Sequence, residues 1–183
     1  MSTTLTLAIE LDRSNPSVMR RVEIPANLTF LQLHDVIQAA MGWADEHLFE
    51  FKVGPWTISM PDDDFVPSTT QWDASRHTLL EMHLTAHDTF SYLYDFGDNW
   101  QHTLTVVDLS SASIKRPRVI SGSGACPPED VGGLHGYYEF LRAWEDPSHP
   151  EHAEYRQWAQ GRYEPEFNLI AADARVSKLA SAP

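Results

Sequence analysis

The chain has 183 residues, of which 42% are hydrophobic, and it contains six Trp, six Tyr and eight Phe. This length and composition predict a globular protein of one domain and exclude an intrinsically disordered one. Lys and Arg number 13 against 26 Asp and Glu, so the formal net charge is −13. A field of that sign argues against nucleic acid as a partner, because phosphate backbones are bound by cationic surfaces.

Cysteine content and hydropathy bear on the compartment. Cys126 is the single cysteine, so no disulfide can form within the chain, which indicates a reducing environment. The N-terminus lacks the basic and apolar regions of a signal peptide, and no apolar run is long enough to cross a bilayer. We therefore expect a cytoplasmic protein with no membrane partner. The sequence leaves the oligomeric state open.

The N-terminal part of the chain predicts a hairpin followed by a helix. Apolar and polar residues alternate over 5–11 and again over 18–24, with a Pro-containing turn between, which is typical of two antiparallel strands. Thr29 with a Gln three residues later is a capping-box pattern, and Gly42 stands where a left-handed C-cap belongs. We expect a helix between these caps, with its apolar face on the hairpin and His34 on its surface.

The middle of the chain predicts further strands. Alternating apolar residues place them at 48–53, 56–60, 90–96 and 100–106. A segment at 80–84 fits either a strand or a helical turn. Between them, 61–72 is expected to be a loop in which Asp62-Asp63-Asp64 stays solvated, because carboxylates adjacent in sequence rarely converge on one ion.

The C-terminal part predicts a loop and then helices. The loop is expected at 110–123, and a helix at 134–141 follows from the spacing of its apolar residues. Pro150 is suited to the first turn of another helix, and Asn168 to the N-cap of a last one.

The order of these elements indicates an α+β fold. We expect a mixed, mainly antiparallel sheet that starts β-β-α-β-β, with C-terminal helices packed against it. A β-grasp-like arrangement is one form consistent with this start. The expected organisation is a single domain over 1–167 and a C-terminal helix or loose tail over 168–183.

Two runs of rare residues stand out. The first, here called the hairpin stretch, is Tyr94-Asp95-Phe96-Gly97-Asp98-Asn99-Trp100-Gln101-His102, and it predicts a strand end, a turn and a strand start. The second, here called the Cys126 loop, covers 124–133 and holds Cys126-Pro127-Pro128-Glu129-Asp130 before Gly132-Gly133.

We expect the two runs to adjoin, braced by bonds from carboxylates to backbone N–H groups. With a three-residue turn at 97–99, Phe96 would face Trp100 and Tyr94 would face His102. Asp95 and Asp98 would also pair with Arg20 or Arg21 as the strands assemble.

These runs resemble the plasmid pRiA4b ORF-3-like family, which includes passenger proteins of insertion elements. The resemblance spans Leu5 to Phe167 and is carried by Arg20-Arg21, Leu33-His34, Gln38, Met41-Gly42-Trp43, His47-Leu48, the hairpin stretch, the Cys126 loop, Gly136-Tyr137, His149-Pro150-Glu151-His152 and Trp158. Met19 stands where the family pattern has Trp, and Val131 where a second cysteine is common, which weakens a two-thiol site. The family has no established activity, so the resemblance implies a fold rather than a reaction.

The polar side chains of the two runs invite comparison with a metal site. Ligand types are abundant, in Asp95, Asp98, His102, Cys126, Glu129, Asp130 and His135. Strand alternation argues against a site that uses Asp95 and His102 together, because it points them to opposite faces of the sheet. We therefore predict no metal and no cofactor, and keep as the alternative a divalent metal held by Asp98, His102 and Glu129.

Cysteine chemistry and anion binding are weaker hypotheses. Cys126 would need a lowered pKa and a base such as His102 or His135 to act as a nucleophile, and its place before two prolines favours packing instead. The N–H groups of Gly132-Gly133 at a helix start could hold an anion. We expect Glu129 or Asp130 to fill that position from within the chain.

These residues favour a binding module over an enzyme and leave an enzyme open. The expected site is a polar, aromatic-rimmed groove that recognises a protein segment or small ligand through Tyr94, Trp100, His102 and Tyr137. Its candidate residues are Tyr94, Asp95, Asp98, Trp100, His102, Cys126, Glu129, Asp130, His135 and Tyr137. The alternatives are a metal-assisted hydrolase using Asp98, His102 and Glu129, and a DNA-associated protein of a mobile element, which rests on the resemblance alone.

Overall fold

The computed structural model describes residues 3–61 and 70–179. Its elements are β1 (Thr4–Leu11), β2 (Met19–Pro25), α1 (Phe30–Met41), β3 (Phe49–Val53), β4 (Trp56–Ser59), β5 (Gln71–Asp73), a 3₁₀ helix (Leu79–Met82), β6 (Thr89–Tyr94), β7 (Trp100–Ser110), β8 (Arg118–Ser123), α2 (Gly133–Glu145), α3 (His152–Trp158) and α4 (Leu169–Val176).

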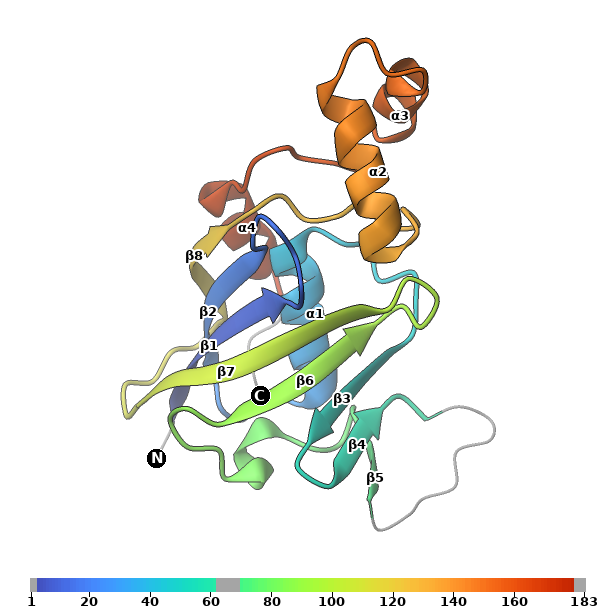
Figure 1. Ribbon diagram of the computed structural model, residues 1–183. Helices are drawn as coiled ribbons and strands as arrows, with labels where there is room; N and C mark the ends of the chain where they lie inside the picture. Colours follow the sequence, from blue (N-terminus) through green and yellow to red (C-terminus); the bar gives the residue numbers. More distant parts are fainter. Residues whose placement is uncertain (1–2, 62–69, 180–183) are drawn as a thin grey trace.

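The strands form one sheet in the order β5-β4-β3-β6-β7-β1-β2-β8. All neighbours run antiparallel except β4 and β5, which are parallel. Helix α1 lies across one face of the sheet (Figure 1). The predicted α+β class, with a mixed, mainly antiparallel sheet and C-terminal helices, is confirmed. No helix in the described ranges has the length and apolar character that crossing a membrane requires.

Helix α1 forms where its capping pattern predicts it. The N–H of Gln32 donates to Thr29 Oγ1 at 3.2 Å, and the N–H of Thr29 donates to Gln32 Oε1 at 2.9 Å, which completes the capping box. Gly42 ends the helix in the left-handed region with φ 93°. Leu33 and Ile37 are fully buried on the sheet side, and each such side chain stabilises the fold by about 1.5–3 kcal/mol.

His34 lies in the core, and its predicted surface position was wrong. Its side chain has no exposed area, its Nδ1 lies 2.8 Å from the Tyr92 hydroxyl, and its Nε2 lies 2.8 Å from Asp45 Oδ1. The ring also stacks on Phe49, with centroids 3.8 Å apart. The apolar stripe of α1 is wide enough to include His34, and the buried imidazole is tolerated because both nitrogens have partners. Burial lowers the pKa of His34.

Two predicted loops contribute strands at the edges of the sheet. Within 61–72, the described end forms part of β5, which pairs with β4, and within 110–123 the chain forms β8, which pairs with β2. Both are short, and neither shows a sustained alternation, so pairing with a neighbouring strand decides their conformation. Asp62-Asp63-Asp64 lies outside the described residues. The segment at 80–84 turns out to be largely the 3₁₀ helix.

The C-terminal helices pack in two places. Figure 1 shows α2 and α3 extending beyond one end of the sheet, whereas α4 lies beside α1 and β8. Asn168 caps α4 as predicted, with Oδ1 accepting from the N–H of Ala171 at 3.1 Å. Ala172 and Val176 of α4 are fully buried, so this helix is part of the core.

Candidate functional site at the junction of the hairpin stretch and the Cys126 loop

The β6–β7 turn is longer than the sequence pattern indicates. Tyr94 pairs with Trp100 and Tyr92 with His102, so five residues, 95–99, lie between the paired positions rather than three. The N–H of Asn99 donates to the Asp95 carbonyl at 2.7 Å, and Asp95 and Asn99 adopt positive φ values of 56° and 58°. Asp and Asn tolerate this conformation better than other side chains. The predicted facing of Phe96 with Trp100 and of Tyr94 with His102 was therefore wrong.

The turn and the Cys126 loop do meet, as predicted. The N–H of Gly132 donates to Asp98 Oδ2 at 3.1 Å. At the next residue, a Cβ placed on Gly133 would come within 2.6 Å of the Asp98 carbonyl oxygen, so only glycine allows this approach. The N-terminal end of α2 thus receives a carboxylate, but from Asp98 of the turn and not from Glu129 or Asp130.

A third segment, residues 43–47, joins this junction. Trp43 Nε1 donates to the Pro127 carbonyl at 2.9 Å, and the N–H of Ala44 donates to Glu129 Oε2 at 3.0 Å. The Tyr94 hydroxyl donates to the other Glu129 oxygen and accepts from the N–H of Glu46 at 3.0 Å. Burial, with the Glu129 carboxylate next, raises the pKa of Tyr94. Glu129 therefore ties the Cys126 loop to β6 and to the end of α1.

His47 brings two carboxylates together within this junction. Its Nε2 lies 3.0 Å from Asp130 Oδ1 and 3.6 Å from Asp95 Oδ2, and one ligand atom from each of the three residues falls within 4.8 Å of the others. Imidazole and carboxylate groups are ligands for divalent metals. Sequence reasoning named Asp95 and Asp130 but missed His47, although His47-Leu48 belongs to the runs that carry the family resemblance.

The structure does not bring Asp98, His102 and Glu129 together as a ligand set. Asp98 bonds to Gly132, Glu129 bonds to Tyr94 and Ala44, and His102 Nδ1 lies 2.9 Å from the Trp100 carbonyl. His102 is fully buried, and burial lowers its pKa to about 4. Among the described residues, these three do not form a group with metal-ligand spacing.

The aromatic side chains expected at a groove rim lie in the core. Tyr94 and His102 are 0% exposed, Trp100 is 1% exposed and Tyr137 is 4% exposed. Pairing of β6 with β7 directs the three strand residues toward Trp43 of the α1 side, where rings pack at centroid distances of 4.9–6.1 Å. The sequence pattern identified an aromatic face correctly but could not show which side of the sheet is covered. His135, in contrast, has 91% of its side chain exposed.

Arg20 does not pair with the carboxylates of the turn. Its Nε donates to the Ala40 carbonyl at 3.1 Å, and its Nη1 donates to the carbonyls of Met19 and Ser123 at 2.8 and 2.7 Å. The predicted pairing of Asp95 or Asp98 with Arg20 is thus replaced by a link between β2, β8 and the end of α1. For Asp95, the bonded partner is instead the N–H of Gly97 at 2.9 Å.

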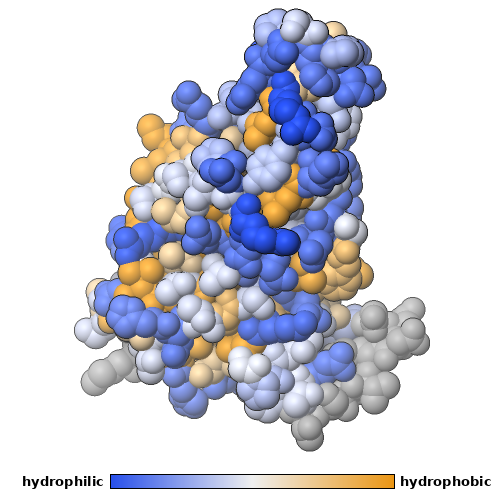
Figure 2. All heavy atoms as spheres, viewed as in Figure 1, coloured by the Kyte–Doolittle hydropathy of each residue, from blue (hydrophilic) through white to orange (hydrophobic). Residues whose placement is uncertain are grey.

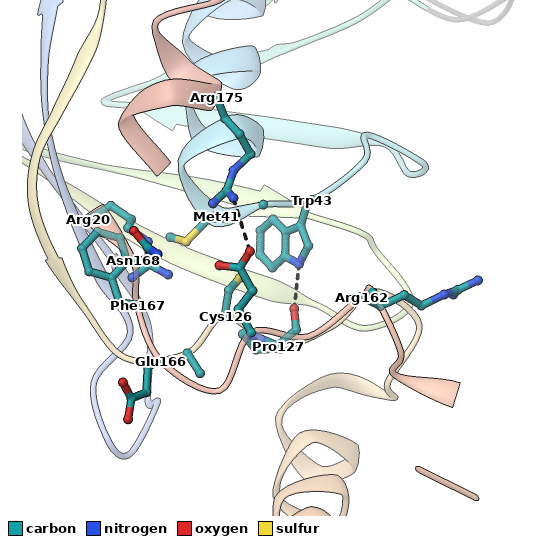
Figure 3. Close-up of a pocket in the computed structure, with 14 residues that line it drawn as sticks. Arg20, Met41, Trp43, Cys126, Pro127, Arg162, Glu166, Phe167, Asn168 and Arg175 are labelled. Atoms are coloured by element: carbon teal, nitrogen blue, oxygen red, sulfur yellow. Dashed lines mark hydrogen bonds and ion pairs between the residues drawn. The ribbon is translucent and has the colours of Figure 1, made fainter. Parts of the chain in front are cut away.

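Cys126 is one of the residues that line a small cavity. Burial raises the pKa of the thiol to about 12, so the thiolate that nucleophilic chemistry requires is scarce near neutral pH. The cavity has a volume of about 80 Å³ and is also lined by Arg20, Trp43, Phe167 and Arg175 (Figure 3).

A wider groove lies beside the β6–β7 turn, at the ends of β3 and β4. Its volume is about 520 Å³. Three exposed apolar side chains line it: Leu48, Met60 and Phe96, at 66%, 40% and 54% exposure. Figure 2 shows apolar surface at this edge of the molecule, just above the grey atoms. The polar part of the lining includes Asp45, His47 and Glu50.

Comparison with known proteins agrees with this fold and these runs. The chain belongs to the plasmid pRiA4b ORF-3-like protein family, whose family model matches residues 3–171. It is 41% identical over 154 residues to the uncharacterized protein y4hQ of Sinorhizobium fredii. The aligned region covers 83% of this chain and 78% of that protein. A crystal structure of a protein of unknown function from Methanosarcina mazei Go1 superposes with a TM-score of 0.80 and 30% identity, over 93% of this chain and 97% of that one. The family named from the sequence is confirmed, and none of these names specifies a reaction.

Proposed function

We propose that the protein is a binding module that holds a segment of another protein in the groove beside the β6–β7 turn. The observation that carries this proposal is the clustering of Leu48, Met60 and Phe96 around one groove of about 520 Å³. Large exposed apolar side chains are normal when scattered, but a group that lines one concavity is typical of an interaction site.

The charge around the groove specifies the kind of segment. Asp45 and Glu50 lie in the lining, and Asp95 and Asp130 are next to His47 at one end. The ion pair of Glu50 with Lys52, at 3.1 Å, offsets one of these charges. The net charge of the chain is −13, so the fitting partner is a basic segment with apolar side chains as anchors.

The test uses synthetic peptides of a dozen or so residues that vary in charge and in apolar content. We expect basic peptides containing Leu or Phe to bind in a fluorescence-anisotropy titration, and binding to weaken as salt screens the charges. Phe96→Ser should reduce the affinity about tenfold or more, as central aromatic contacts do. Leu80→Ser is the matched control, because Leu80 is 54% exposed on the 3₁₀ helix outside the groove. Equal loss from both variants, or no binding by any peptide, would refute the proposal.

A second candidate function is divalent-metal binding at His47, Asp95 and Asp130. The distances of 3.0 and 3.6 Å from His47 Nε2 to the two carboxylates bracket the roughly 3.3 Å that separates neighbouring ligands around a tetrahedral ion with 2.0–2.1 Å bonds. Elemental analysis of untagged protein and the thermal shift with added Zn²⁺ or Mn²⁺ test it. A shift in the wild type that disappears in His47→Gln, and persists in His135→Gln, is the expected result. An equal response of both variants, or no shift at all, contradicts it.

A further inference from the structure

The small cavity beside Cys126 lies between parts of the chain that are far apart in sequence. The end of α1, the Cys126 loop, the segment 161–168 and α4 all contribute to its lining, and its volume is about 80 Å³. Figure 3 shows Arg20, Cys126, Phe167 and Arg175 around it, with the Trp43 side chain closing one side. It is separate from the groove proposed above for a protein segment, which has a different lining.

Arg20 is held at the cavity by three hydrogen bonds, and these bonds do not use its Nη2 nitrogen. The residue is 2% exposed, and its plane lies over the Phe167 ring at 4.3 Å from the centroid. Its three bonds to the carbonyls of Ala40, Met19 and Ser123 use Nε and both hydrogens of Nη1. Within the described residues, the two N–H groups of Nη2 make no hydrogen bond.

Arg175 approaches the same cavity from α4. Its Nε donates to the Ala39 carbonyl at 2.8 Å, one residue before the carbonyl that Arg20 binds. Its Nη1 lies 3.8 Å from Glu164 Oε1, which is an ion pair but too long for a hydrogen bond. In the described part of the chain, the N–H groups of both terminal nitrogens of Arg175 therefore donate no hydrogen bond. Figure 3 draws the ion pair with Glu164 as a dashed line on the Cys126 side of the guanidinium.

The resulting balance of charge favours an anion. Three arginines and two glutamates line the cavity, although the chain as a whole carries −13. The negative end of the α1 dipole amounts to about half an elementary charge, less than the two guanidinium charges beside it. Burial lowers the pKa of Arg20, and the charge of Arg175 contributes to the lowering, yet arginine stays protonated in proteins.

The negative charge at the cavity comes chiefly from Glu164. The Cys126 thiol is neutral near pH 7, because burial raises its pKa to about 12. Glu164 is the nearby carboxylate, with 62% of its side chain exposed to solvent. Arg162 and Glu166 also line the cavity, but their charged ends point away from it in Figure 3.

We propose that this cavity binds a small oxyanion, a carboxylate or an inorganic phosphate-type anion, between Arg20 and Arg175. Guanidinium donors fit the oxygens of both classes, and charge-assisted bonds of this kind are about twice as strong as neutral ones. A cavity of about 80 Å³ is several times what one water requires, so it admits an anion of a few non-hydrogen atoms. Glu164 holds the place of this anion in its absence and moves aside into solvent when the anion binds.

Isothermal titration with inorganic phosphate and with acetate, at constant ionic strength kept with NaCl, tests the proposal. At least one of the two anions is expected to bind, and comparison of the two identifies the class. Acetamide, which has the shape of acetate without its charge, should not bind. Arg175→Gln should weaken the binding at least tenfold, whereas Arg162→Gln should change it less than twofold.

Glu164→Gln provides the decisive second variant. Removing the competing carboxylate should tighten binding severalfold, an effect that a purely structural role of this exposed residue does not produce. If Arg175→Gln fails to fold, this tightening alone decides the question. Absence of phosphate and acetate binding in both wild type and Glu164→Gln overturns the proposal. So does equal affinity of wild type and Arg175→Gln, or a Glu164→Gln affinity that equals or falls below that of the wild type.

Discussion

At the scale of single residues, the junction depends on a backbone contact between Gly133 and Asp98. Gly133 has a φ of 66°, and a Cβ there would lie 2.6 Å from the Asp98 carbonyl oxygen. Gly54 offers a control, since its φ is 56° and a Cβ there would meet nothing within 4 Å. The two glycines share the conformational demand and differ in the space around them.

Gly133→Ala should therefore destabilise the protein more than Gly54→Ala. The left-handed conformation costs a non-glycine residue about 1–2 kcal/mol, which both variants incur. The clash at Gly133 should raise its total to about 3 kcal/mol or more, in the range of the severe point mutations. Urea unfolding of the two variants measures the difference. Equal free energies of unfolding would show that the turn and the Cys126 loop do not meet as described.

The buried His102 makes stability depend on pH. Its folded pKa of about 4 lies below the ordinary histidine value of 6.5, so between these values the unfolded chain binds more protons than the folded one. The free energy of unfolding should decrease as the pH falls from about 6.5 to 4, by about 3 kcal/mol from this residue. Above pH 6.5 the residue is neutral in both states and has no effect.

Urea unfolding of the wild type and of His102→Gln across pH 4–8 tests this pH dependence. The variant should lose part of the wild-type slope between pH 4 and 6.5, with the remainder due to His34 and to carboxylates. His135→Gln should keep the full slope, because that side chain is 91% exposed. A His102→Gln slope equal to that of the wild type would contradict a buried, neutral imidazole.

At the scale of elements, α4 shows that the folded unit extends beyond residue 167. Its Ala172 and Val176 are buried, Asp173 Oδ1 accepts from the N–H of Val119 in β8 at 2.8 Å, and Arg175 donates to α1. The family model extends to residue 171, inside this helix. We infer that the folded unit continues beyond 167 and includes α4.

Two substitutions within α4 compare the contribution of a buried side chain to stability with that of an exposed one. Val176→Ala should lower the free energy of unfolding by about 2 kcal/mol, since it removes buried methyl groups and leaves a cavity. Ile170→Ala should change it by less than about 0.5 kcal/mol, because Ile170 is 83% exposed. Thermal and urea unfolding check both values. A neutral Val176→Ala would mean that the core does not need this helix.

At the scale of the whole molecule, one end of the sheet collects the residues that carry the family pattern. The hairpin stretch, the Cys126 loop and residues 43–47 converge there through Asp98, Glu129 and His47. Both the cavity and the groove border this junction, since Cys126 and Trp43 line the cavity while His47 and Phe96 line the groove. A rigid support of this kind positions binding residues better than isolated loops do.

The sequence by itself determined the features that depend on neighbours along the chain. The caps of α1, the alternation of β1 and β2, and the turn character of the hairpin stretch are local, because backbone conformation and nearby side chains decide them. The rarity of the two runs also sufficed to identify the family, and their carboxylates and glycines indicated that they would brace each other.

Only the tertiary structure decided which side chains are covered and which distant groups meet. It buried His34, Tyr94, Trp100 and His102, added β5 and β8, and joined His47 to Asp95 and Asp130. The alternation of apolar and polar residues predicts which face of a strand a side chain lies on, but it does not predict what packs on that face. Contacts such as those of Arg20 and Arg175 with α1 join residues 20 and 136 positions apart, and they exist because packing of the whole core brings those residues together.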